Sequence, residues 1–199
     1  MHYIGQISIF LVVFSFSFLE SWGQPVRAPK LISEINTDDE LIKMLGSSIP
    51  SEADKSVVQI FSMREKVIGH LMNLKGNDTI FMGTCLTNPD DYVIDTLNEG
   101  TAVTVEVAAL YLISAIYYDN LVFATVPYLA GDADIRDSRY NTKKRKKRAW
   151  KSVEKWFHEL QADGLKELRR RELSPLKFAN MQFYGFNPTR KRAPSICLR

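Results

Sequence analysis

The stretch Thr101–Leu129 reads TAVTVEVAALYLISAIYYDNLVFATVPYL and is the most apolar part of the chain outside its N-terminus. It contains two acidic residues, Glu106 and Asp119, and no basic residue. A helix that is apolar on nearly every side is a buried helix, so the other elements must pack around it. The sequence therefore predicts a mainly α-helical single domain wrapped around a buried apolar helix at about 102–118.

A membrane span is the alternative interpretation of this stretch. A span needs about 20 apolar residues, whereas the run from Ala102 to Tyr118 is shorter and contains Glu106. A carboxylate near a bilayer is costly without a partner. We therefore expect a core helix and no stable membrane span, and the β-branched residues of Ala102–Val107 leave some strand character open.

Three helices are predicted before the core. Thr37 and Glu40 form a capping box at the start of a short first helix. Apolar residues at three- and four-residue steps mark an amphipathic second helix from about Glu52 to Leu74. The third, 88–100, opens with Asn-Pro-Asp-Asp, which combines a capping residue, proline and acids that the helix dipole favours.

The segment after the core carries an acidic loop. Asp132, Asp134 and Asp137 are spaced in part like the ligands of a calcium loop. The glycine at the sixth position and the glutamate at the twelfth are missing, so a solvated loop is the better interpretation. We predict no metal site and no cofactor.

The sharpest local signal is the basic linker 143–148, which reads KKRKKR. We expect an extended polar loop here, where proteolytic nicking concentrates. Arg145, Lys146, Lys147 and Arg148 resemble the Arg-x-Lys-Arg recognition sequence of furin-type proprotein convertases. The resemblance covers these four substrate residues alone, and it implies cleavage after Arg148.

Other interpretations of the basic residues remain open. In a cytosolic chain, 143–148 would indicate a nuclear or nucleic-acid patch. In a secreted chain, the run is otherwise a solvated loop or a surface for sulfated glycans. A second basic cluster, Arg190–Arg192, offers a weaker cleavage site on a Pro-containing tail.

The C-terminal part, 149–199, is predicted to be a basic helix followed by an irregular tail. Trp150, Val153, Phe157 and Leu160 follow helical spacing, and aromatic stripes of this kind face a core more often than a ligand. We expect this part to pack on the acidic helical body, 24–142. The body carries 17 acidic and 9 basic side chains, so the two parts attract each other.

The N-terminal segment 1–23 has the pattern of a secretory signal peptide. An apolar block from Ile7 to Leu19 precedes small residues at Ser21 and Gly23, which predict cleavage before Gln24. The segment lacks Lys and Arg, so an uncleaved N-terminal anchor is the alternative. We expect a secreted, extracellular protein.

If the chain is secreted, its two cysteines predict a disulfide and one sequon predicts an N-glycan. Cys85 and Cys197 form an even pair, which in an oxidising compartment predicts one disulfide. Two unrelated thiols, or an intermolecular bond through Cys197, are the alternatives. Asn77-Asp78-Thr79 is an N-glycosylation sequon in a predicted turn, so we expect a glycan at Asn77.

Three classes of function compete. We favour a secreted non-enzymatic protein that acts by binding or as a structural component, matured by cleavage after Arg148. A partner would be an extracellular protein or a polyanion such as a glycosaminoglycan, with a proprotein convertase as processing enzyme and no nucleic acid. A peptide-hormone-like precursor is the second class, although the chain has no array of repeats.

An enzyme is the third class, and the sequence offers little support for it. The chain after residue 23 has two histidines, His70 and His158, each on a predicted helix. It contains no Gly-x-Ser-x-Gly, no Gly-rich phosphate loop and no HExxH. We therefore assign no catalytic residue.

Overall fold

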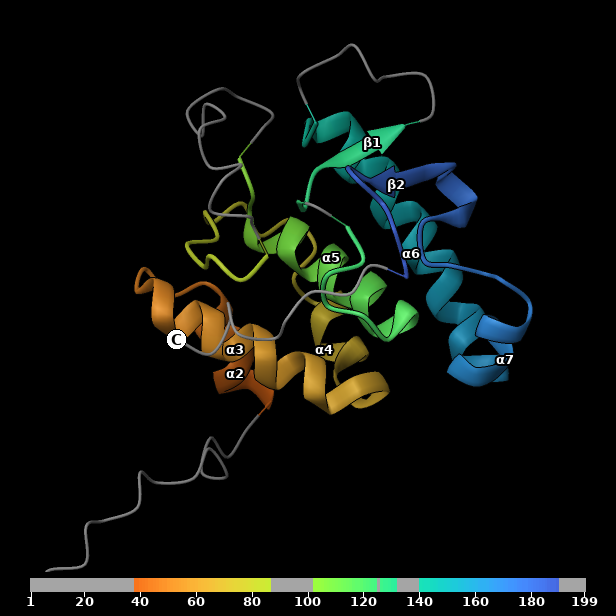
Figure 1. The fold of residues 1–199 in the computed structure, drawn as a ribbon, viewed down its shortest axis with the longest axis horizontal. Helices are drawn as coiled ribbons and strands as arrows, with labels where there is room; N and C mark the ends of the chain where they lie inside the picture. Colours follow the sequence, from red (N-terminus) through yellow and green to blue (C-terminus); the bar gives the residue numbers. More distant parts are fainter. Residues whose placement is uncertain (1–37, 87–101, 125, 132–139, 190–199) are drawn as a thin grey trace, which may run out of the picture. The chain divides into compact units, whose positions relative to one another are not determined.

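The computed structural model describes residues 38–86, 102–124, 126–131 and 140–189, all within the unit Thr37–Arg199. Helices dominate this part of the chain (Figure 1). The predicted mainly α fold around a buried helix is confirmed. The leader, the helix predicted at 88–100, the acidic loop, the second basic cluster and Cys197 lie outside the described residues.

The buried helix is α5, Val105–Tyr118, and every residue from Val105 to Tyr117 is buried. Thr104 precedes it in an extended conformation and forms an isolated bridge with Ile80, so strand character is confined to that one position. The helix ends at Asp119, whose φ of 53° and ψ of 35° are left-handed. Within the described residues, every helix is too short or too polar to cross a bilayer.

The helices before α5 pack on one another and on α5. They are α2, Asp38–Leu45, α3, Pro50–Met63, and α4, Ile68–Met72, and both α3 and α4 contact α5. A 3₁₀ turn η2, Arg64–Val67, separates α3 from α4. The continuous helix predicted from Glu52 to Leu74 is therefore wrong at its centre.

The break lies at Arg64, which has φ 58° and ψ −137°. This region of backbone space is unfavourable for a residue with a side chain and costs about 1–3 kcal/mol. The Arg64 side chain forms an ion pair with Asp119 and lies 4.8 Å from the centroid of the Phe61 ring. The apolar periodicity continues across the break, because Val67, Ile68 and Leu71 are buried.

Helix α6, Lys143–Asp163, is followed across Gly164 by α7, Leu165–Arg170. The basic run 143–148 forms the first turns of α6, so its prediction as an extended linker is wrong. Thr142 caps the helix, and its Oγ1 accepts a hydrogen bond from the Arg145 backbone N–H at 3.3 Å. Lys and Arg have high helix propensity, but cations in a first turn oppose the helix dipole.

Burial explains why α6 begins early despite this charge. Ala149, Trp150 and Val153 are each at most 1% exposed. The helix contacts α5 and α7, the 3₁₀ turn η4 (Lys177–Ala179) and the strand β1 (Leu129–Gly131). Trp156 is 0% exposed whereas Phe157 is half-buried. The predicted stripe is thus correct at most positions, but Trp156 and not Phe157 is the central ring of the packed face.

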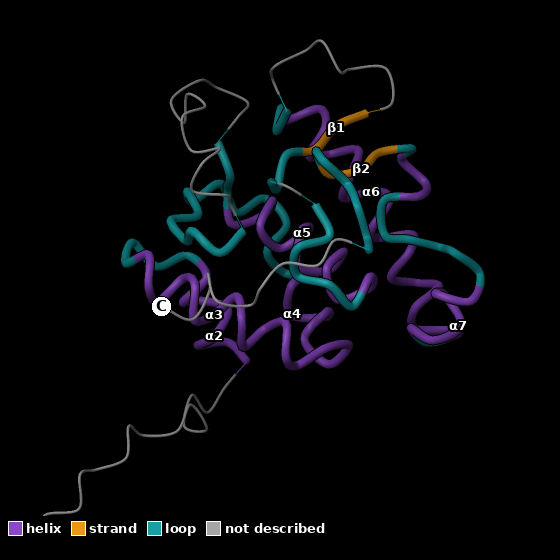
Figure 2. Tube along the Cα trace, in the orientation of Figure 1, coloured by secondary structure: helices purple, strands orange, loops and turns teal. Residues whose placement is uncertain are grey.

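The C-terminal part is more ordered than predicted. After the 3₁₀ turn η4, Lys177–Ala179, strand β2, Met181–Phe183, pairs antiparallel with β1, Leu129–Gly131 (Figure 2). The register places Leu129 opposite Phe183. Phe183 is 1% exposed because its ring packs against Tyr111 of α5. The tail prediction missed this strand, since its aromatics show no sequence period.

Candidate functional site

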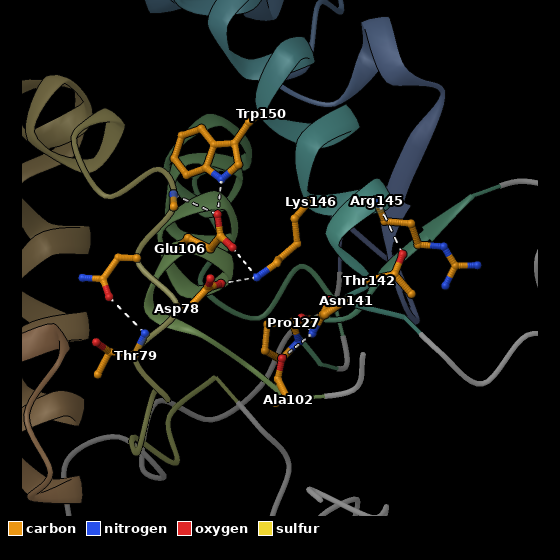
Figure 3. A network of polar contacts seen from close by, with 12 residues as sticks. Asp78, Thr79, Ala102, Glu106, Pro127, Asn141, Thr142, Arg145, Lys146 and Trp150 are labelled. Carbon is orange, nitrogen blue, oxygen red and sulfur yellow. Dashed lines mark hydrogen bonds and ion pairs between the residues drawn. The ribbon is translucent and has the colours of Figure 1, made fainter. Parts of the chain in front are cut away.

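A buried carboxylate lies at the start of α5. Glu106 is 4% exposed, and its Oε2 accepts hydrogen bonds from Trp150 Nε1–H at 3.1 Å and from the Gly76 backbone N–H at 3.0 Å. Its Oε1 forms an ion pair with Lys146 Nζ (Figure 3). A buried carboxylate is costly unless it is paired and hydrogen-bonded, and here both oxygens have partners.

Lys146 links two carboxylates that come from different parts of the chain. Its Nζ contacts Glu106 and lies 2.5 Å from Asp78 Oδ1. The lysine side chain is 14% exposed, whereas that of Asp78 is 75% exposed, so one partner is inside and the other faces solvent. The second turn of α6, the start of α5 and the turn at 75–78 are thereby joined at one point.

The charges of this site stabilise one another. The hydrogen bond and the charge of Lys146 lower the pKa of Asp78. Burial opposes the charge of Lys146, but its hydrogen bonds to Asp78 and Glu106 outweigh this, and the pKa of Lys146 is raised. Lys146 and Asp78 are therefore ionised throughout the neutral range.

An open cleft of about 350 Å³ adjoins this network. Lys143, Lys147 and Lys151 line it from α6, at positions i, i+4 and i+8, which lie on one helix face. At 1.5 Å per residue the three lysines span about 12 Å of the helix axis. None of them forms an ion pair with another residue of the described ranges.

The acidic residues of the cleft are already paired. Glu106 and Asp78 share Lys146, and Glu154 accepts from Lys75 Nζ at 2.5 Å. Since Lys146 serves two carboxylates, the five lysines and three carboxylates of the cleft leave an excess of two positive charges. Trp150, its aromatic residue, is 1% exposed and uses its N–H on Glu106.

A second open hollow, of about 650 Å³, lies at the other end of α5. Its Arg169 donates from Nε to the Tyr117 carbonyl and from Nη2 to the Ile116 carbonyl, each at 2.7 Å. Burial, with a smaller effect of Tyr118, raises the pKa of Tyr117 to about 12. Arg169 therefore caps the C-terminal end of helix α5, and its guanidinium is already bound to carbonyl groups of the fold.

The predicted cleavage residues do not share one environment. Arg145 is 8% exposed and Lys146 is held by its two carboxylates, whereas Lys147 and Arg148 face solvent. The residue after the predicted scissile bond, Ala149, is 0% exposed. Cleavage after Arg148 stays a prediction, and the segment it needs is helical.

The other predicted modification sites are partly described. Asn77 is half-buried, and its Oδ1 accepts a hydrogen bond from the Thr79 backbone N–H at 3.1 Å, as in an Asx turn. Cys85 is 7% exposed, and Cys197 lies outside the described residues. The glycan at Asn77 and the disulfide Cys85–Cys197 remain predictions.

The two histidines lie on different helices. His70 Nδ1 is 3.7 Å from Asp39 Oδ1, and His158 is exposed on α6. Among the residues that the structure describes, no three His, Cys, Asp or Glu side chains gather as a metal site would require. Neither histidine contacts the cleft beside Glu106.

Sequence reasoning singled out Glu106 and Lys146 for separate reasons and did not join them. The signal available was the lone carboxylate in an apolar helix, which requires a buried cation or several donors. Nothing in the sequence selects Lys146 from the 26 basic residues as that cation. Comparisons of the chain with models of protein families, with curated proteins and with solved structures give no match.

Proposed function

We propose that the protein is a non-enzymatic, secreted binding protein that takes a sulfated polysaccharide on the lysine face of α6. The observation that carries the proposal is the cleft lined by Lys143, Lys147 and Lys151, which form no ion pair within the described ranges. Binding a polyanion there neutralises the excess positive charge of the cleft.

The rigidity of the surface supports this function. Lys146, the residue before Lys147, forms an ion pair with Glu106 of the buried helix α5. This pair fixes the part of α6 that carries the three lysines on the core. Side chains presented by a fixed helix need little backbone ordering on binding, and preorganisation improves affinity. An extended loop, as predicted from the sequence, would lose this advantage.

The same cleft is poorly suited to nucleic acid. Proteins that bind single strands without sequence preference combine a cationic groove with exposed aromatic rings on which bases stack. The aromatic ring of this cleft, Trp150, is buried and hydrogen-bonded to Glu106. A ligand with charges and no bases fits the surface better, and the signal-peptide pattern of 1–23 agrees with an extracellular ligand.

The test is retention on immobilised heparin as a function of salt. We expect Lys143, Lys147 and Lys151, all changed to Gln, to lower affinity at least tenfold and to reduce the salt dependence, because fewer counterions are displaced. The matched control changes Lys55, Lys166 and Lys177 to Gln, which removes the same charge from other exposed positions. Equal losses in both variants, or stronger binding of single-stranded DNA than of heparin, contradict the proposal.

A further inference from the structure

The basic run that resembles a convertase site is built into folded structure. Its residues form the first turns of α6, and a protease that cuts after basic residues must bind several of them in an extended form. Cleavage of a folded chain then proceeds through local opening, and its rate follows the population of the open form when reclosing is fast.

The residues on both sides of the peptide bond after Arg148 are fixed by burial or by ion pairs. Before it, Arg145 is 8% exposed and Lys146 is joined to Glu106 and Asp78. After it, Ala149 and Trp150 are 0% and 1% exposed. Opening this segment removes an indole from the core and breaks the Trp150–Glu106 hydrogen bond together with the ion pair.

Glu106 is the residue on which these contacts converge. It binds Lys146 on the N-terminal side of the bond and Trp150 on its C-terminal side, and Figure 3 shows its carboxylate between the two side chains. In the Arg-x-Lys-Arg pattern Lys146 occupies the variable position. Glu106 thus binds a residue, Lys146, whose identity the Arg-x-Lys-Arg pattern does not specify. The ion pair still fixes the backbone of the neighbouring residues that the pattern does specify.

We propose that the folded protein keeps the run 143–148 protected from proteases that cut after basic residues, and that the Glu106 carboxylate sets how often the segment opens. Cleavage after Arg148 is then conditional: it occurs when α6 has released its first turns from α5. This inference does not depend on the polysaccharide-binding proposal.

The experiment is a time course of limited trypsin digestion of the full chain under native conditions, with fragments quantified by mass spectrometry. Cuts within 143–148 are compared with cuts in a free peptide of residues 140–152. We expect the protein to be cut there at least about a hundredfold more slowly than the peptide. Rates within a few-fold of each other overturn the proposal.

The variant Glu106→Gln keeps the shape of the side chain and removes its charge. We expect cuts within 143–148 to accelerate about tenfold, while cuts at Arg169–Arg171, at the C-terminal end of α7, keep their rate. The α7 site serves as an internal reference, because global unfolding exposes both sites. Equal acceleration at both sites, or none at 143–148, overturns the role of Glu106.

Two further variants keep the test decisive if Glu106→Gln folds poorly. Asp78→Asn removes the solvent-facing partner of Lys146, whose side chain is 75% exposed, and we expect a two- to threefold acceleration within 143–148. The control Glu154→Gln removes an exposed carboxylate of the same cleft that binds Lys75, and we expect no change. A control that accelerates as much as Asp78→Asn contradicts the proposal.

Discussion

The start of helix α5 is fixed by polar contacts, whereas the helix from its middle to its end packs mainly against aromatic rings, with Arg169 bound to its last carbonyls. At its start, Glu106 is held by one lysine and two N–H donors. At the middle of the helix, Tyr111 lies 4.7 Å from Phe123 between ring centroids, and at its end Tyr118 lies 5.2 Å from Phe123. Strands and loops distant in sequence supply further rings, since Phe183 lies 5.7 Å from Phe123.

The comparison separates what stabilises this fold from what orients it. Burial of apolar ring surface is large and non-directional, so the ring cluster stabilises the packed helix more than it fixes any one neighbour's position. A buried ion pair adds little net stability but becomes costly when one member is lost. We infer that the aromatic end holds the fold together, and that the Glu106 end fixes the position of α6.

The largest expected effect is at the aromatic end. Phe123 is 1% exposed and contacts four rings, so Phe123→Ala should lower the free energy of unfolding by about 3–5 kcal/mol. Urea denaturation measures this. Phe123→Leu keeps more of the volume and should lose clearly less; equal losses would show that the ring packing is unimportant.

Removal of the Glu106 side chain, at the polar start of α5, should cause the second-largest loss in the free energy of unfolding. Glu106→Ala leaves Trp150 Nε1–H and the Gly76 N–H without an acceptor and leaves Lys146 with Asp78 alone, which we expect to cost about 3 kcal/mol. The control Glu154→Ala removes an exposed partner of Lys75 and should cost less than about 1 kcal/mol. Similar losses for the two variants in urea denaturation would contradict the account.

A buried amide gives a third, smaller effect. Asn141 is 4% exposed, its Oδ1 accepts from the Leu129 N–H at 3.1 Å, and its Nδ2 donates to the carbonyls of Ala102 at 3.2 Å and Pro127 at 3.3 Å. Asn141→Ala should cost about 2 kcal/mol, because backbone groups lose their partners. A change below about 0.5 kcal/mol in urea denaturation would show that water replaces the amide.

The smallest effect concerns pH. The pKa of Lys146 is raised above 10.5, so its stabilisation is complete below that pH and is lost as pH rises through the raised value. The pKa of Asp78 is lowered below 3.8, so its contribution is present above that pH and is lost as pH falls through the lowered value.

The stability difference between the wild type and Asp78→Asn, which leaves Glu106 paired with Lys146, should therefore stay constant from about pH 5 to 9, and shrink above pH 10.5 and below pH 3.8. Thermal unfolding across this range measures the difference. A marked change near neutral pH would show that another group controls the site.

The sequence predicted the part of the fold that depends on hydrophobic pattern. The apolar run around Tyr111 gave α5, and the spacing from Val57 to Leu71 gave the helices beside it, because burial dictates that periodicity. The break at Arg64 was not predicted, because the apolar periodicity continues across it and neither glycine nor proline occupies that position.

The candidate site was predicted only in fragments. Six consecutive cations, Lys143–Arg148, suggested a loop, because local charge repulsion and the helix dipole both disfavour a helix there. The compensating contacts come from Glu106 and Asp78, which lie 40 and 68 residues away from Lys146. Such pairings depend on tertiary structure and leave no local pattern.

The most direct test of the central claim is a double-mutant cycle between Glu106 and Lys146. Unfolding free energies are measured in urea for the wild type, Glu106→Gln, Lys146→Met and the double variant. We predict a favourable coupling energy of about 2 kcal/mol, since the two side chains are in contact and largely buried. Additive effects, with a coupling near zero, would contradict the claim that this ion pair holds α6 on the core.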